Sequence, residues 1–390
     1  MIRYILPFLC LFCIFLAEED LKHVKHAVLD KNTKIVFWGT RHGNRNPTQF
    51  LKEVIDKKSQ TWGFEGDSEL TKFGKRQAFG LGAELRKYLS GYLDDNYLAP
   101  EAKFFSSSAS RCQMTLQLAL AGLYPPKTFA TWKPNINWTP VPYTIDDPML
   151  RMYAIKCPKS DKVWEPISHD LLPELKEQLT RHKALLDYMH KNTGWNASLA
   201  NAADLADNLL EIQYYKAAYP EWIKNVRLPG YKNSEELIKA YMSFMESHQI
   251  ACAVYEPCRR MMSGYWLNTI LDVIKNVKSG KKSPKVIGYA SHTEITLALM
   301  KALFVEKEEL TTTAGFVLEV RDKPEWSVRV LNHDPIEFDN HVIYKSKYEP
   351  IMARKADNDG WVKYDDFVRF VTPHSIKDWR RECGTTSCEL

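Results

Sequence analysis

Three short apolar segments, each followed by a segment with helical spacing, constrain the fold of this chain more than any other feature. The apolar segments are rich in β-formers and bounded by polar residues, which predicts buried strands. They span residues 34–40 (KIVFWGT), 103–106 and 285–290 (KVIGYA), and the helical segments that follow span residues 71–89, 110–123 and 294–304. Strands and helices that alternate in this way predict the α/β class.

Two longer stretches, residues 166–219 and 234–277, are helical in pattern throughout and predict a helical subdomain. Residues 316–321 and 326–331 alternate around the turn Asp322-Lys323-Pro324, which predicts an antiparallel hairpin. The class is therefore α/β with a helical insertion.

The first seventeen residues predict a secretory signal peptide. Arg3 precedes an apolar run from Ile5 to Leu16, and the run closes on Ala17. This run of about a dozen residues is shorter than the roughly 20 needed to span a bilayer, so we expect no membrane anchor after cleavage. The mature domain would span residues 18–390, with an α/β core at about 30–160 and 280–390 and the helical subdomain at about 161–279.

Cysteine content fits an exported protein. Removal of the signal leaves six cysteines: Cys112, Cys157, Cys252, Cys258, Cys383 and Cys388. An even number predicts up to three disulfides, although spacing alone does not choose the pairing, and only proximity suggests Cys252 with Cys258. These six include no C-x-x-C pair and have no His nearby at ligand spacing, so we expect no zinc or other metal. Sequons at Asn137 and Asn196 predict glycosylation.

The charge balance argues against nucleic acid as a partner. Lys and Arg number 53 against 48 acidic residues, a formal net charge of +5, and these charges are scattered along the chain. Such a surplus is too small and too dispersed for a nucleic-acid interface.

Immediately after the first predicted strand comes the motif R-H-G-x-R-x-P, from Arg41 to Pro47. Its two guanidiniums flank one imidazole at the C-terminal end of a strand, which is where open α/β sheets bind ligands. Guanidinium forks match phosphate oxygens, and a neutral imidazole can attack phosphorus once those oxygens are neutralised. We expect Gly43 to permit a tight turn. The motif predicts a phosphate site of Arg41, His42 and Arg45, whereas the alternative is a solvated basic turn.

The motif and several landmarks after it resemble the histidine acid phosphatases, in particular the prostatic and lysosomal branch and its relatives in insect venom. The landmarks follow in order through most of the mature chain: Leu70-Thr71 with Gly74, Ser106 to Arg111 leading into LALAGLYPP, Trp132-Lys133-Pro134 through Trp138 to Pro142, Cys157-Pro158, Tyr219-Pro220-Glu221-Trp222, and Asp378-Trp379 through Cys383. The resemblance implies a phosphoglycerate-mutase-like core sheet flanked by helices with an inserted helical subdomain. It also implies hydrolysis of phosphate monoesters through a phosphohistidine, without a cofactor or metal.

The resemblance assigns further residues. Arg111 matches a third phosphate-binding arginine, and His292 matches the second active-site histidine. Most members place Asp directly after that histidine as the proton donor, whereas here Thr293 follows and Glu294 is the first carboxylate, so we expect Glu294 to be the acid. The family also pairs Cys157 with Cys383.

We therefore expect a secreted, extracellular acid phosphatase that acts on small phosphate monoesters, rather than a resident of the lysosomal lumen. The resemblance leaves open whether it forms a homodimer, as some relatives do. Two alternatives remain at this point. Glu294 two positions after the histidine also occurs in inositol-phosphate phosphatases. The changed acid position would also fit a weakly active secreted homologue that serves as a binding or venom component.

Overall fold

The computed structural model describes residues 21–52 and 63–385. The predicted signal peptide and Cys388 lie outside these residues. The chain divides into two compact units, each considered by itself below. Of the described residues, the sheet unit comprises 24–44, 72–166 and 249–385, and the helical unit comprises 21–23, 45–52, 63–71 and 167–248.

The sheet unit is built around one sheet that has eight strands within the described residues. The order is β3-β2-β4-β1-β5-β6-β7, with β8 paired to β6. The strands are β1 (Thr33–Arg41), β2 (Ala102–Ser106), β3 (Thr144–Ile145), β4 (Val286–Ser291), β5 (Gly315–Arg321), β6 (Ser327–Glu337), β7 (Asn340–Lys345) and β8 (Val362–Lys363). Strands β3, β2, β4 and β1 are parallel, and β5, β6 and β7 are antiparallel to their neighbours, so the predicted hairpin is confirmed as β5–β6. Every residue of the central β1 except Lys34 is buried.

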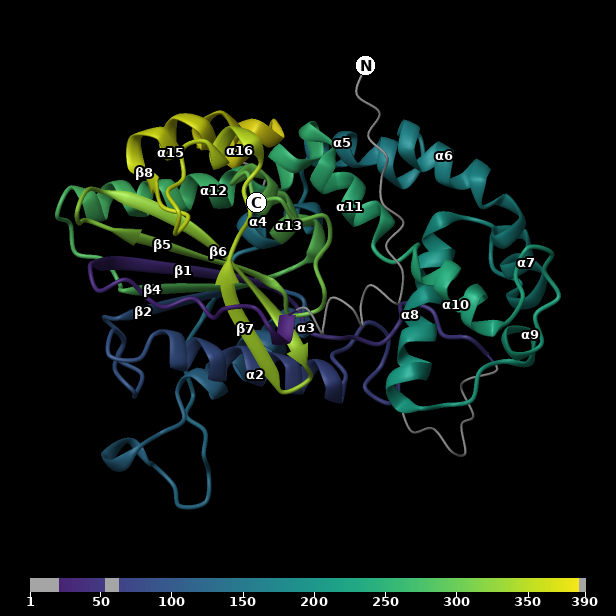
Figure 1. The fold of residues 1–390 in the computed structure, drawn as a ribbon, viewed down its shortest axis with the longest axis horizontal. Coiled ribbons are helices and arrows are strands. Elements are labelled where there is room, and N and C mark those ends of the chain that lie inside the picture. Colours follow the sequence, from purple (N-terminus) through teal and green to yellow (C-terminus); the bar gives the residue numbers. More distant parts are fainter. Residues whose placement is uncertain (1–20, 53–62, 386–390) are drawn as a thin grey trace. The chain divides into compact units, whose positions relative to one another are not determined.

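Helices cover both faces of this sheet (Figure 1). In this view α2 (Lys72–Tyr88) and α3 (Ser110–Leu123) lie below it, and α12 (Glu256–Lys278), α13 (Thr293–Ala302), α15 (Tyr364–Val371) and α16 (Trp379–Cys383) lie above it. Shorter elements complete the unit: η1 (Thr128–Ala130), α4 (Asp147–Leu150), η2 (Met152–Ala154), α14 (Pro350–Ala353) and η3 (Thr372–His374). The predicted α/β class, a central sheet flanked by helices, is confirmed.

Helices α2 and α3 are packed so closely that their contact requires glycine. A Cβ atom added at Gly82 would lie 1.9 Å from the carbonyl oxygen of Ala119, which is backbone and cannot rotate away. Around this contact the apolar side chains of both helices are buried, among them Leu81, Leu85 and Leu116. Because α3 begins beside the end of β2, this packing also fixes the first turn of α3, which carries Arg111.

The helical unit contains α6 (Pro173–Arg181), α7 (Lys183–Thr193), α8 (Leu199–Tyr215), α9 (Glu221–Lys224) and α10 (Ser234–Met242). Two further helices, α5 (Pro158–Ser168) and α11 (Ser247–Val254), span the residues where the chain passes from one unit to the other. Ser198 caps the N-terminus of α8, where its hydroxyl accepts the backbone N–H of Asn201, and Gly194 caps the C-terminus of α7 in the left-handed conformation. Sequence periodicity predicted helices here, and Leu175, Leu186 and Met189 are buried.

Two disulfides lie in the sheet unit. Cys157 and Cys383, 226 residues apart, are joined, as are Cys252 and Cys258. The Cys112 thiol is free and buried at the start of α3. Within residues 21–52 and 63–385, no helix combines the length and apolar character that crossing a bilayer requires.

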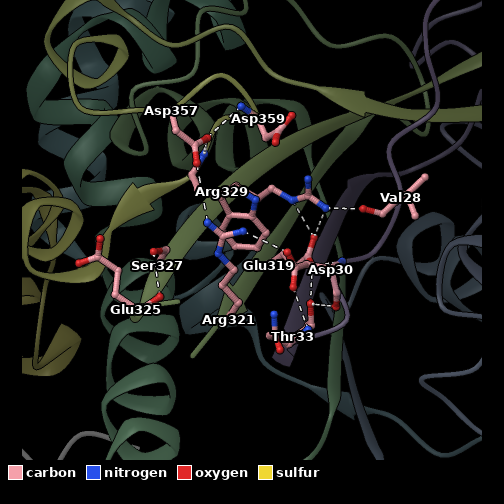
Figure 2. Close-up of polar contacts among 12 residues, drawn as sticks. Val28, Asp30, Thr33, Glu319, Arg321, Glu325, Ser327, Arg329, Asp357 and Asp359 are labelled. Atoms are coloured by element: carbon pink, nitrogen blue, oxygen red, sulfur yellow. Dashed lines mark hydrogen bonds and ion pairs between the residues drawn. The ribbon is translucent and has the colours of Figure 1, made fainter. Parts of the chain in front are cut away.

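A buried charge network joins β5, β6 and the segment before β1 (Figure 2). The carboxylate of Glu319 is fully buried and accepts bonds from Arg329 Nε at 2.8 Å, Tyr88 Oη at 2.6 Å and Asp30 N at 2.8 Å. It also accepts from the hydroxyl of Thr33, the first residue of β1. A buried carboxylate is tolerated when it is this fully paired. The network therefore anchors the strand that leads to the R-H-G motif.

Candidate active site

The imidazole of His42 is fixed by the backbone at the end of β1. Its N–H donates to Ser291 O at 3.0 Å, its carbonyl oxygen accepts Thr313 N at 3.1 Å, and its Nδ1 lies 2.9 Å from Gly43 O. A carbonyl can only accept, so Nδ1 carries a proton and, in the neutral ring, Nε2 carries the lone pair. This is the tautomer that a nucleophilic Nε2 needs.

Gly43 is required for a different reason from the one predicted. Its φ is not in the left-handed region, where glycine would be favoured, so a turn conformation does not explain it. A Cβ atom at this position would lie 2.6 Å from Gly74 O and 2.8 Å from Gly74 Cα. The backbone of α2 therefore packs directly on the motif. The Gly43 N–H donates to Thr115 Oγ1 at 3.0 Å, which ties the motif to α3.

His292 follows β4 and lies beside His42. Parallel pairing of β1 with β4 places Arg41 opposite Ser291, and the two imidazole centroids are 5.6 Å apart with their planes at 73°. Nη2 of Arg111 lies 3.3 Å from Nδ1 of His292. Because a guanidinium only donates, Nδ1 accepts, and Nε2 of the neutral ring then donates to Ser107 Oγ at 3.0 Å. The structure thus brings His42, His292 and Arg111 together.

Glu294 lies in the first turn of α13 and is only 7% exposed. It accepts a hydrogen bond from the phenol of Tyr153, a half-buried residue of η2. Burial, and then the negative charge of Glu294, raises the Tyr153 pKa well above its usual value, so this phenol is a permanent donor. The Tyr153 ring also meets the His292 ring at 5.7 Å between centroids, which places Glu294 and His292 around one aromatic side chain.

Arg41 is buried at the end of β1 with 4% exposure, and Nη1 donates to Leu310 O at 2.5 Å. Burial raises the pKa of Glu309, and the positive charges of Lys307 and then Arg41 partly oppose that rise. The charge of Arg41 therefore acts on this carboxyl group. Arg41 therefore supplies a buried positive charge directly before His42.

Arg45 belongs to the helical unit, and its partners there are acidic. Nη2 lies 2.9 Å from Asp207 Oδ2, and Nη1 donates to Asn46 O. Burial opposes the charged form of Arg45, but the carboxylates of Asp207, Glu246 and Asp204 outweigh it and raise the Arg45 pKa. Burial and the charge of Asp207 raise the Asp204 pKa to about 6.

Sequence reasoning missed Tyr153, Ser107 and Thr115, whose contacts with Glu294, His292 and Gly43, respectively, join segments that are distant in the sequence. Thr115 accepts from Gly43 N and donates to Arg111 O at 2.7 Å, so one hydroxyl joins two predicted site segments. Only a serine run after β2 gave any hint of Ser107. Both sequons are exposed at the asparagine, Asn137 and Asn196. Among the described residues, no group of three His, Cys, Asp or Glu side chains is arranged to hold a metal ion.

Known proteins resemble this chain over nearly its whole length. It is 26% identical to human lysosomal acid phosphatase over 359 residues, covering 89% of this chain and 79% of that protein. It is 24% identical to human prostatic acid phosphatase, covering 93% and 90%. The phytase of Klebsiella sp. ASR1 shares the fold, with a TM-score of 0.63, 14% identity, and coverage of 91% of this chain and 98% of that one.

These findings together define the chain as a phosphatase of the α/β class. The family model of the histidine phosphatase superfamily (branch 2) matches residues 20–320. The chain belongs to that superfamily.

Proposed function

We propose that this protein is a secreted acid phosphatase that hydrolyses phosphate monoesters through a phosphohistidine on His42. The observation that carries the proposal is the position of the His42 imidazole: Nδ1 is held by Gly43 O, and the ring lies 5.6 Å from that of His292, which contacts Arg111. A lone pair on Nε2 beside fixed cations suits attack on a dianionic phosphate, because the cations neutralise the oxygens that would repel it.

In the first step, Nε2 of His42 forms a bond to phosphorus as the ester P–O bond breaks. Arg41, Arg111 and His292 stabilise the equatorial oxygens, and the R-H-G-x-R-x-P motif of the sequence assigns the same role to Arg45. Glu294 gives its proton to the departing alcohol oxygen. The products are the free alcohol and phosphohistidine, with Glu294 ionised.

In the second step, ionised Glu294 takes a proton from water as that water attacks phosphorus, and the N–P bond breaks. Inorganic phosphate leaves, and His42 and Glu294 return to their starting protonation states. The hydrogen bond from Tyr153 orients the Glu294 carboxyl group, so the acid keeps one defined position through both steps. Guanidinium groups supply the charge stabilisation in this scheme.

We also propose that the protein is extracellular. Two disulfides within the sheet unit, the exposed sequons at Asn137 and Asn196, and the apolar N-terminal segment support an oxidising, lumenal route. The relatives named lysosomal and prostatic acid phosphatase support the same chemistry in such compartments.

The test compares two esters at mildly acidic pH: p-nitrophenyl phosphate, whose leaving group needs no proton, and glycerol 2-phosphate, whose alkoxide does. His42→Ala should abolish turnover of both. Glu294→Gln should lower kcat for glycerol 2-phosphate by about 10²- to 10⁴-fold and affect p-nitrophenyl phosphate far less. Glu308→Gln, an exposed carboxylate after α13, is the matched control and should behave like the wild type.

Robust turnover by the wild type excludes a mere binding protein. Equal turnover of glycerol 2-phosphate by Glu294→Gln and the wild type would remove Glu294 as the acid. Quenching a single turnover of ³²P-labelled ester in alkaline SDS should trap base-stable, acid-labile phosphoprotein, and this label should be absent from His42→Ala.

A further inference from the structure

Arg151 is a guanidinium beside the candidate site that no part of the phosphate chemistry above uses. It lies at the junction of α4 and η2, in a fixed backbone: its N–H donates to Asp147 O at 2.8 Å, and its carbonyl accepts Ala154 N at 2.8 Å. The residue before it, Leu150, accepts the Ser291 hydroxyl through its carbonyl at 2.7 Å. The segment that carries Arg151 is therefore tied to the end of β4.

The charge of Arg151 is not balanced by any nearby carboxylate. Among the described residues it forms no ion pair. Its one side-chain hydrogen bond is from Nη1 to the neutral Ser108 Oγ at 3.2 Å, and its buried Nε has no partner. Asp147, four residues before Arg151, uses Oδ1 to accept Ser108 N at 2.8 Å. A buried charged donor without a partner is costly unless a ligand supplies the acceptor.

Arg151 is linked to His292 through the ring of Tyr153. Arg111 contacts His292 directly, whereas the Arg151 guanidinium lies 5.7 Å from the centroid of Tyr153, whose other neighbour is His292. Both arginines act electrostatically on the Cys112 thiol, which lies 3.5 Å from His292 Nε2. Arg151 thus faces the same side-chain cluster without contacting the histidines.

We infer that Arg151 binds a second anionic group of the substrate, and that the preferred substrates are phosphate monoesters whose alcohol part carries a carboxylate or a second phosphate. This rests on the proposed function, because it assigns Arg151 to the ester that His42 attacks. A planar guanidinium with free donors recognises carboxylate and phosphate through paired hydrogen bonds. The contact with the Tyr153 ring and the fixed backbone hold the fork in place before the substrate arrives.

Matched substrates test the inference. Glycerol 3-phosphate and 3-phosphoglycerate share a carbon skeleton and differ by a hydroxymethyl group against a carboxylate. Fructose 6-phosphate and fructose 1,6-bisphosphate differ by a second phosphate. The measured quantity is the ratio of kcat/KM for the more anionic ester to that for its partner, taken for each pair in the wild type and in Arg151→Gln.

Arg151→Gln should lower this ratio about 10- to 100-fold, mainly through KM, in at least one pair, and the affected pair identifies which anion is bound. Arg151→Lys keeps the positive charge but not the planar pair of donors, so its ratio should fall less than that of Arg151→Gln. Arg111→Gln should lower kcat/KM for both esters of each pair by the same factor, because Arg111 binds the phosphate that both esters share.

An unchanged ratio for both pairs in a folded Arg151→Gln variant overturns the inference, as does an equal fall for both members of each pair. Folding is checked by circular dichroism and by turnover of p-nitrophenyl phosphate. If the wild type hydrolyses none of the esters, the proposed phosphatase function fails instead, so the two failures are distinguishable.

Discussion

Replacing Arg329 by Met should destabilise the sheet unit by about 3–5 kcal/mol, because it leaves a buried charge without its counterion. The carboxylate of Glu319 is 0% exposed, and the nearest Arg329 nitrogen lies 2.6 Å away. After the substitution this carboxylate keeps three neutral donors, from Asp30, Thr33 and Tyr88. Neutral donors do not cancel the charge, so most of the free-energy cost of burying the Glu319 carboxylate is no longer offset.

The assay is equilibrium urea unfolding with the disulfides intact. The control is Lys363→Met. The exposed lysine, in β8, pairs at 3.0 Å with Glu325 in the turn before β6, and this pair should contribute less than about 1 kcal/mol. The double variant Glu319→Gln with Arg329→Met should lose less than the sum of the two single losses, because both charges leave together. The reasoning is refuted if Arg329→Met unfolds at the same urea concentration as Lys363→Met.

Two further predictions follow from burial of titratable groups. Because burial and then Asp207 raise the Asp204 pKa to about 6, protonated Asp204 favours the folded state at low pH, and this contribution is lost as the pH rises through about 6. Asp204→Asn should therefore raise the urea midpoint at pH 7.5 but hardly at pH 4, and an equal effect at both would contradict the assignment. Burial also raises the Cys112 pKa to about 11, so iodoacetamide at pH 8 should leave Cys112 unmodified in the folded protein and modify it in urea. Peptide mapping checks this, and rapid labelling of the folded protein would exclude it.

Periodicity and the motif were sufficient for the parts of the fold whose signals are local. The buried runs that became β1 and β4 predict both strands, and parallel strands end at one edge of a sheet, so His42 and His292 were expected to meet there. The antiparallel hairpin of β5 and β6 was predictable because its two strands are neighbours in the sequence and alternate around a turn. Sequence periodicity predicted that α12 is a helix, but it did not predict that this helix belongs to the sheet unit.

Contacts between distant segments were not predictable. Tyr153 lies in a single turn of 3-10 helix with no periodic pattern, and only the folded chain places its phenol against Glu294. Gly43 was expected for its conformational freedom, whereas the packing of Gly74 is what excludes a side chain. Asp204 and Asp207, two of the acidic partners of Arg45, lie in α8, and the third, Glu246, directly precedes α11. All three are more than a hundred residues from Arg45 along the chain, so no local motif predicts them.

One residue, Ser291, links the segments on which the proposed chemistry depends. Its carbonyl oxygen accepts the His42 N–H, its hydroxyl donates to Leu150 O, and it is the last residue of β4, directly before His292. The attacking imidazole, the second histidine and the segment that carries Arg151 are therefore positioned from a single point of the sheet. Because that point lies inside a buried strand, the spacing between the reacting phosphate and a second anion is a property of the core, and substitutions of exposed loop residues should change it little.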